Sequence, residues 1–186
     1  MNWSINENAI PTLAVGFTRG MDTLGDAIAL SRGGLAAVHD ASFPTHAFMF
    51  TREQGRLFAT EETPSGLVEK GLAEYCQDNN RIVSVYFWRG WQDEEKADAA
   101  LRYLANVRAD GARNSKYDFL GLLSFLPFIG RWFKPDPQKQ ICSENCASIH
   151  KTFGASWIVQ TVIAPDQLEM LMRHNEECKC ILNYYL

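Results

Sequence analysis

The chain has 186 residues, a formal net charge of -4 at pH 7, 46% hydrophobic residues and 22% charged residues. This length and balance are typical of one globular domain with its own core, and they exclude a largely disordered chain. Because the Lys and Arg residues are scattered rather than clustered, the sequence offers no basic surface, and we expect no nucleic-acid partner.

The first half of the chain is predicted to be mostly β-structure. We expect a short strand at Ala27–Leu30 that ends at a glycine pair and is followed by a loop or short helix. Residues 45–51 and 56–62 are rich in β-branched and aromatic side chains, and a four-residue link with a glycine joins them as a hairpin. Residues 81–89, RIVSVYFWR, predict a further strand.

The second half of the chain is predicted to be mostly helical. A helix starts after Asp93, which suits an N-cap, and stops at Gly111. Further helices are expected over residues 142–153 and after Pro165, and residues 179–186 are expected to close the domain as a strand. Strands followed by helices indicate an α+β fold.

An apolar run, Phe119 to Phe133, lies between these helices and is interrupted by Pro127 and Gly130. A membrane span requires about 20 apolar residues, so this run is predicted to be buried helix and loop. A partly exposed wall that receives a greasy substrate or touches a membrane surface is the less favoured alternative.

Cys142, Cys146 and His150 are spaced four residues apart and share one face of a predicted helix. A helix rises about 1.5 Å per residue, so Cys142 and His150 lie about 12 Å apart along its axis and cannot bind one metal ion. Cys146 and His150 could do so with Cys178 and Cys180, but Cys-x-Cys differs from the usual zinc spacing of roughly two to four intervening residues. We expect no metal and no cofactor.

Cys142 is the stronger candidate for a nucleophile. At the start of a helix its sulfur lies over unpaired N–H groups and the positive end of the helix dipole, which stabilise a thiolate. Cys146 lies one turn deeper, where this effect fades, and would pack as a small hydrophobe. His150 is too far from Cys142 to act as its base, because proton transfer requires about 3 Å. The remaining candidate bases are His39, His46 and His174.

His46 stands at the start of a predicted strand, on the same face as Phe48 and Phe50. Glu61 and Glu62 end the next strand, and because adjacent residues point to opposite faces, only one of them can reach a histidine on its neighbour. That carboxylate would hold the imidazole in orientation and favour its charged form.

Taken in chain order, the segments THAFMF, FATEETPSGL, SVYFWRG, KYDFLGLL and ICSENCA resemble the circularly permuted NlpC-type papain-like cysteine peptidases, in their YiiX-like branch. The resemblance covers residues 25–154. It implies a papain-like α+β fold in which a small antiparallel sheet packs against a helix that carries the nucleophile. It also implies Cys142 as nucleophile, His46 as general base and Glu61 as the residue that orients His46.

The resemblance also assigns supporting residues. Tyr117 matches the family tyrosine near the site and is expected to donate to the oxyanion together with the N–H of Cys142. The Asn145-Cys146 pair is similar to one in the related lecithin retinol acyltransferase-like enzymes, which keeps Cys146 as the alternative nucleophile. Glu62 is the alternative orienting acid, because a one-residue slip of its strand would exchange the faces.

These residues predict a cysteine hydrolase, a peptidase or amidase that forms a thioester acyl-enzyme on peptide or isopeptide bonds. The resemblance implies that these bonds are of the cell-wall type. The alternatives are a lipid acyltransferase or lipid hydrolase with the same triad, and a binding module without catalysis. With no recognisable signal peptide or transmembrane helix, cytoplasmic residence is expected. The resemblance implies a bacterial or bacteriophage setting. Residues 1–186 are treated as one domain in which 1–24 and 155–186 are peripheral elements.

Overall fold

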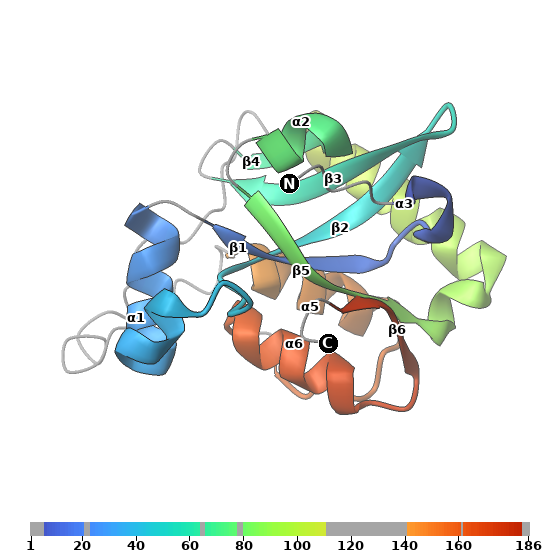
Figure 1. Cartoon of the computed structure of the whole chain (residues 1–186). Helices are drawn as coiled ribbons and strands as arrows, with labels where there is room; N and C mark the ends of the chain where they lie inside the picture. Colours follow the sequence, from blue (N-terminus) through green and yellow to red (C-terminus); the bar gives the residue numbers. More distant parts are fainter. Residues whose placement is uncertain are drawn as a thin grey trace.

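The computed structural model describes residues 6–20, 23–63, 66–77, 80–110, 141–160 and 162–183. Within these ranges, six strands form one antiparallel sheet in the order β4-β3-β2-β1-β5-β6 (Figure 1). The strands are β1 (Val15–Gly20), β2 (His46–Glu53), β3 (Arg56–Thr63), β4 (Gly66–Gly71), β5 (Asn80–Trp88) and β6 (Cys178–Asn183). The helices are α1 (Thr23–His39), α2 (Leu72–Gln77), α3 (Glu94–Asp110), α5 (Cys142–Thr152) and α6 (Pro165–His174), with short 3-10 turns at Glu7–Ala9 and Arg89–Gln92.

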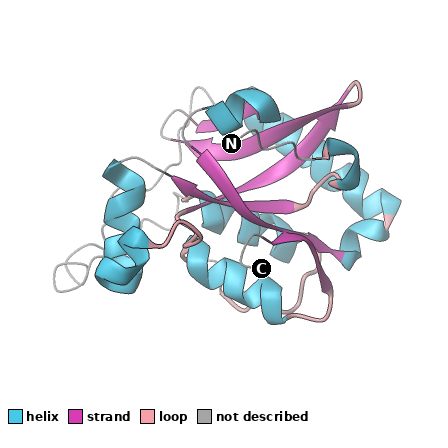
Figure 2. Ribbon diagram, viewed as in Figure 1, coloured by secondary structure: helices cyan, strands magenta, loops and turns pink. Residues whose placement is uncertain are grey.

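Helices cover both faces of the sheet (Figure 2). On one face, α3, α5 and α6 bury Leu104, Ile149 and Leu168 in a cluster with Val15 and Met49 of the sheet. On the opposite face, α2 packs its buried side chains in a second cluster with β2, β3 and β5. The α+β class predicted from the sequence is confirmed, with an antiparallel sheet and α5 packed against β2 and β3.

The predicted hairpin between residues 45–51 and 56–62 is confirmed as β2 and β3. Its turn has only two residues, Gln54 and Gly55, whose φ angles of 48° and 81° are both in the left-handed region that such turns require. The register places Met49 opposite Thr60 and Phe50 opposite Ala59. The pairing therefore fixes which side chains of β2 and β3 share a face.

The predicted helices are confirmed as well. The Asp93 carboxylate accepts a hydrogen bond from the backbone N–H of Lys96 at 3.2 Å, as expected of a residue that caps α3. Pro165 occupies the first turn of α6, where its missing N–H costs nothing. The closing strand is β6, which begins at Cys178.

The predicted strand at Ala27–Leu30 is wrong, because these residues lie inside α1. A short apolar run has no periodicity that separates a strand from a helix. In the structure one side of this run is buried and the other is exposed, since Ala29 is buried while Leu30 is 49% exposed. The glycine pair marks a kink rather than an end, with Gly34 at φ 69°.

Residues 1–24 and 155–186 are not merely peripheral, which corrects the expectation from the sequence. β1 lies between β2 and β5 in the middle of the sheet, and β6 pairs with β5. β1 obtains its hydrogen bonds from segments distant in the chain, so local sequence pattern carries little sign of it, whereas β6 matches the closing strand expected from the sequence. β4 and α2 were also absent from the sequence-based expectations, and both prove important to the site.

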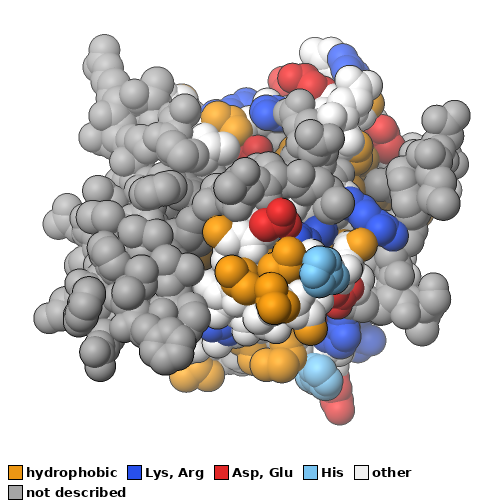
Figure 3. All heavy atoms as spheres, turned by 60° about the vertical axis from the view of Figure 1, so that its left-hand side comes forward, with side chains coloured by type: hydrophobic (Ala, Val, Ile, Leu, Met, Phe, Trp, Pro, Cys, Tyr) orange, Lys and Arg blue, Asp and Glu red, His pale blue; other side chains and the backbone are white. Residues whose placement is uncertain are grey.

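Figure 3 shows the face of the molecule that carries α1. Hydrophobic side chains lie at this surface among acidic, basic and histidine side chains. The α1 helix contributes Leu30 and Leu35, which are 49% and 71% exposed. The buried Arg19 of β1 fixes this helix to the sheet by donating hydrogen bonds to Asp26 at 2.6 Å and to the carbonyl of Val38 at 3.1 Å.

Candidate functional site

The first turn of α5 holds Cys142 in a fixed place. Ile141 is the N-cap residue, and its backbone N–H donates a hydrogen bond of 2.9 Å to the Glu144 carboxylate. The Ser143 hydroxyl donates to the carbonyl of Ile163 at 2.6 Å, which ties the turn to the segment before α6. Cys142 is therefore the first residue of the helix, where backbone N–H groups have no partner within the helix and favour a negative charge.

His46 and Glu61 meet on the face of the sheet that α2 covers. His46 begins β2, Glu61 lies near the end of β3, and the His46 Nε2 atom is 2.5 Å from Glu61 Oε2. Both side chains are mostly enclosed, with 22% of the His46 side chain and 10% of the Glu61 side chain exposed. A short, shielded contact of this kind fixes the imidazole ring and favours its charged form.

Cys142 lies close to the His46 imidazole, and its charge and hydrogen-bonding both act on the pKa of that ring. Because Nε2 is engaged by Glu61, the nitrogen that remains for Cys142 is Nδ1. Burial alone would lower the pKa of His46, but the charge of Cys142, the hydrogen bond to it and the contact with Glu61 together raise that pKa well above its usual 6.5. The three residues are thus neighbours, with the imidazole between the thiol and the carboxylate.

Glu62 lies on the opposite face of β3 from Glu61. Its carboxylate accepts a hydrogen bond of 3.0 Å from the Asn145 side-chain amide, one turn into α5. Glu62 is 6% exposed. The neighbouring carboxylates therefore have separate contacts: Glu61 contacts His46, and Glu62 joins the helix that carries Cys142 to the sheet.

Tyr75 of α2 is a neighbour of this site that sequence reasoning missed. Its ring is fully buried and packs against Phe48 with centroids 4.7 Å apart, and its hydroxyl lies 3.3 Å from the Thr18 hydroxyl. Burial raises the pKa of Tyr75 well above 10, and the nearby charges of Glu61 and Cys142 raise it further. The phenol therefore stays neutral. A signal for Tyr75 would have required recognition of α2, whose six residues are too few to show a clear helical period.

The other cysteine and histidine of α5 have structural surroundings. Cys146 is 3% exposed in the core between α5 and the sheet, and burial followed by the charge of Cys142 raises its pKa well above 9. His150 is 1% exposed, accepts a hydrogen bond from the Trp91 indole at 3.2 Å, and contacts the Cys146 carbonyl through Nδ1 at 2.8 Å. His39 and His174 lie exposed at the ends of α1 and α6.

Tyr117 and the run Phe119 to Phe133 lie outside the described residues. Within the described ranges, no group of three or more His, Cys, Asp or Glu side chains is arranged to hold a metal ion. In the same part of the chain, none of the helices combines the length and apolarity needed to cross a bilayer. All five cysteines are described and are free.

No protein-family model matches the chain, and no curated protein matches its sequence. Function is therefore inferred from the residues and their geometry. A thiol at a helix N-terminus, an imidazole close to it and a carboxylate in contact with the imidazole are the three groups that nucleophilic acyl transfer requires.

Proposed function

We propose that the protein is a cysteine hydrolase in which Cys142 is the nucleophile, His46 the general base and acid, and Glu61 the residue that orients His46. The observation that carries this proposal is the 2.5 Å contact of His46 with Glu61, together with the proximity of Cys142, whose charge raises the pKa of His46. This arrangement supports transfer of the thiol proton to the imidazole, which leaves a thiolate at the positive end of α5.

In the first half of the reaction, the Cys142 thiolate attacks the carbonyl carbon of an amide. The carbonyl oxygen becomes an oxyanion, for which the backbone N–H of Cys142 at the start of α5 is a suitable donor. The C–N bond then breaks, and the His46 imidazolium gives its proton to the departing amine. The product is a thioester on Cys142 and a free amine.

In the second half, a water molecule attacks the thioester. His46, now neutral, takes a proton from this water, and the second tetrahedral intermediate expels the Cys142 sulfur as a thiolate. The released acid leaves, and the charged imidazole and thiolate are restored. Glu61 keeps its contact with Nε2 throughout, so that Nδ1 stays directed at the reacting atoms.

We further propose the permuted papain-like fold and a substrate with peptide or isopeptide bonds of the cell-wall type, in a bacterial or bacteriophage setting. The permuted fold is supported by the order of three residues along the chain: His46 lies on one strand, Glu61 on the next strand and Cys142 at a helix start. The antiparallel sheet with α5 packed on β2 and β3 supports it as well. The substrate class rests on the family resemblance alone.

The test is to trap the acyl-enzyme. The protein is mixed with a panel of short peptides and cell-wall peptide fragments at acidic pH, quenched, and analysed by intact and peptide mass spectrometry. An acyl adduct on Cys142 that disappears with time, together with its absence from Cys142→Ala, is the expected result. Parallel reactions with phospholipid vesicles distinguish a lipid acyltransferase from a peptidase or amidase, because an acyltransferase would carry a fatty acyl adduct on Cys142. If the Cys142→Ala variant still turns over substrates of the panel, the proposal is refuted.

A further inference from the structure

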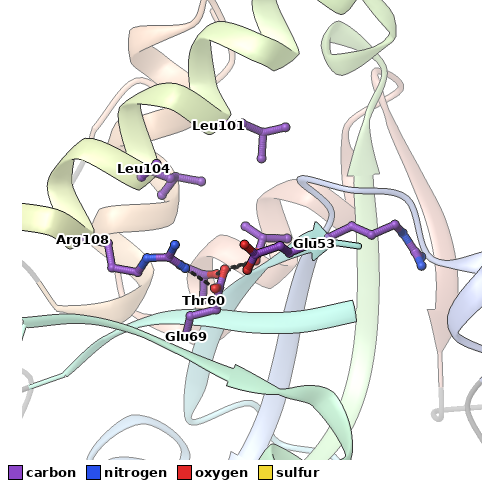
Figure 4. A pocket seen from close by; sticks show the side chains of 9 residues that line it. Glu53, Thr60, Glu69, Leu101, Leu104 and Arg108 are labelled. Carbon is purple, nitrogen blue, oxygen red and sulfur yellow. Dashed lines mark hydrogen bonds and ion pairs between the residues drawn. The ribbon is translucent and has the colours of Figure 1, made fainter. Parts of the chain in front are cut away.

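A cavity lies away from the His46–Glu61 contact, between α3 and strands β2, β3 and β4 (Figure 4). Its volume is about 180 Å³. This is smaller than the roughly 300–1,000 Å³ of pockets that take drug-sized ligands, so it suits a group the size of one amino acid. The side chains of Leu101 and Leu104 from α3 form an apolar wall above a polar floor.

The polar floor is built around Glu69, which has 14% of its side chain exposed. Its Oε1 atom accepts hydrogen bonds from the Thr51 hydroxyl at 2.5 Å and from the Thr60 hydroxyl at 3.2 Å. Its Oε2 atom forms an ion pair with the Arg108 guanidinium, which extends from α3 toward the floor (Figure 4). Glu69 therefore holds Arg108 in place at the cavity.

Arg108 keeps donors for a ligand. A guanidinium has five N–H donors, and among the described residues the acceptor that Arg108 contacts is Glu69. Its side chain is 41% exposed. The other arginine at the cavity, Arg52, is engaged elsewhere, because it donates to the backbone carbonyls of Gly55, Glu7 and Ile10 at 2.8, 2.8 and 3.1 Å. Arg108 is thus the cation available to bind a carboxylate.

Glu53 provides the opposite charge. It lines the same cavity, on the same face of β2 as Thr51, and is exposed. In the described part of the chain its carboxylate has no side-chain partner. The cavity therefore offers one cation and one anion with bonding capacity to spare. Because Glu69 and Arg108 are paired with each other, a ligand with a carboxylate alone would meet the charge of Glu53, and a ligand with an amine alone would leave the spare N–H donors of Arg108 unused.

We propose that this cavity binds a small free α-amino acid with an aliphatic side chain. Arg108 receives the carboxylate, Glu53 receives the ammonium group, and Leu101 and Leu104 contact the side chain. This inference goes beyond the proposed hydrolase activity and needs no chemistry at Cys142. The cavity is nevertheless adjacent to the helix of Cys142, since Thr60 and Leu104 also line the narrow gap that reaches Cys142.

The test uses the full chain and valine as the probe. Two-dimensional NMR follows backbone amide shifts during titration with valine, N-acetylvaline and valinamide, which remove in turn the ammonium charge and the carboxylate. Valine is expected to shift amides around Thr60 and Leu104. The two derivatives are expected to bind at least about tenfold more weakly, because each loses one charge-assisted contact.

Three variants complete the design. Arg108→Gln and Glu53→Gln are each expected to weaken valine binding about tenfold or more. Arg102→Gln, an exposed arginine on the same helix that does not line the cavity, is the matched control and should bind as the unmodified protein does. Glu53 is at the surface, so its replacement tests the site even if Arg108→Gln fails to fold.

The outcome of the valine experiment does not depend on the proposed hydrolase function. Valine binding should persist in Cys142→Ala, so a failed hydrolase assay leaves this inference intact. The inference is overturned if valine causes no shifts at the cavity, if N-acetylvaline or valinamide binds as well as valine, or if Arg102→Gln weakens binding as much as Arg108→Gln does.

Discussion

Glu61 and His46 stand on neighbouring antiparallel strands, and Glu61 Oε2 lies 2.5 Å from His46 Nε2. The next residue, Glu62, points to the other face and binds Asn145 of α5 at 3.0 Å. Because side chains alternate along a strand, two adjacent carboxylates serve the two partners of the candidate site from opposite faces of one strand. Because Glu61 and Glu62 have different partners, replacing each one alone distinguishes their roles.

Replacing Glu61 with Gln is expected to slow alkylation of Cys142 by about tenfold or more at pH 7. The amide removes the negative charge that favours the His46 imidazolium, and with it the charge that supports a thiolate on Cys142. The measurement is the rate of iodoacetamide labelling, followed by mass spectrometry. Glu62→Gln is the matched control and should retain a rate within about threefold, because an amide can still bond to Asn145. Equal losses in the two variants would contradict separate roles.

The pH dependence of His46 is expected to follow its raised pKa. Attraction to Cys142 and Glu61 outweighs burial, so His46 should remain protonated above pH 6.5 in the folded protein. A raised histidine pKa contributes stability that is fully present below about pH 6.5 and is lost as pH rises through the folded-state value. NMR titration of the imidazole carbons measures this directly. Cys142→Ala should lower the pKa of His46, and a titration unchanged by that substitution would argue against contact between the two side chains.

His150 is expected to change stability with pH in the opposite direction to His46. Burial lowers the pKa of His150 to about 4 despite its backbone contact with Cys146. The folded protein then binds fewer protons than the unfolded chain between pH 6.5 and pH 4, so stability falls as pH falls through this window. The loss in the free energy of unfolding is on the order of 3 kcal/mol, because a shift of one pKa unit corresponds to about 1.36 kcal/mol. Urea unfolding of His150→Gln, compared with the unmodified protein from pH 7 to pH 4, should show a shallower decline; identical pH dependence would contradict it.

Cys146 is expected to stay unreactive in the folded protein. Both burial and the charge of Cys142 raise its pKa, and it packs in the core cluster between α5 and the sheet, whereas Cys142, itself 5% exposed, begins the helix close to His46. Iodoacetamide at pH 7.5 should modify Cys142 and reach Cys146 only after unfolding in urea. Cys146→Ala should keep the labelling rate of Cys142 and lower the free energy of unfolding by about 1 kcal/mol, the cost of a small cavity. Faster labelling of Cys146 than of Cys142 would reverse the choice of nucleophile.

The sequence allowed the local features to be predicted and left the long-range ones open. The hairpin of β2 and β3 and the helix α3 have strong signals, namely a glycine-containing turn between β-rich runs and a capped 3.6-residue period. β1 has no such signal, because its place in the middle of the sheet depends on pairing with β2 and β5, which come later in the chain. The apolar run at Ala27–Leu30 is locally compatible with a strand or a helix. Packing of α1 against β1 favours the helix.

The candidate site shows the same division. Helix geometry alone separated His150 from Cys142, and strand alternation alone required Glu61 and Glu62 to face opposite ways. Which carboxylate reaches His46 depends on strand register, which the resemblance suggested and local pattern could not supply. Tyr75 depends on α2, and the Glu69–Arg108 contact joins β4 to α3 across 39 residues, so neither follows from spacing in the chain.

The central claim is that His46 activates Cys142, and the most direct measurement is the second-order rate of Cys142 alkylation by iodoacetamide at pH 6. An ordinary thiol, with a pKa of about 8.5, is almost fully protonated at this pH and reacts slowly. We expect rapid labelling of Cys142 in the unmodified protein and at least about a tenfold slower reaction in His46→Gln, with His174→Gln unchanged as the control. Equal rates in the unmodified protein and in His46→Gln would contradict the claim.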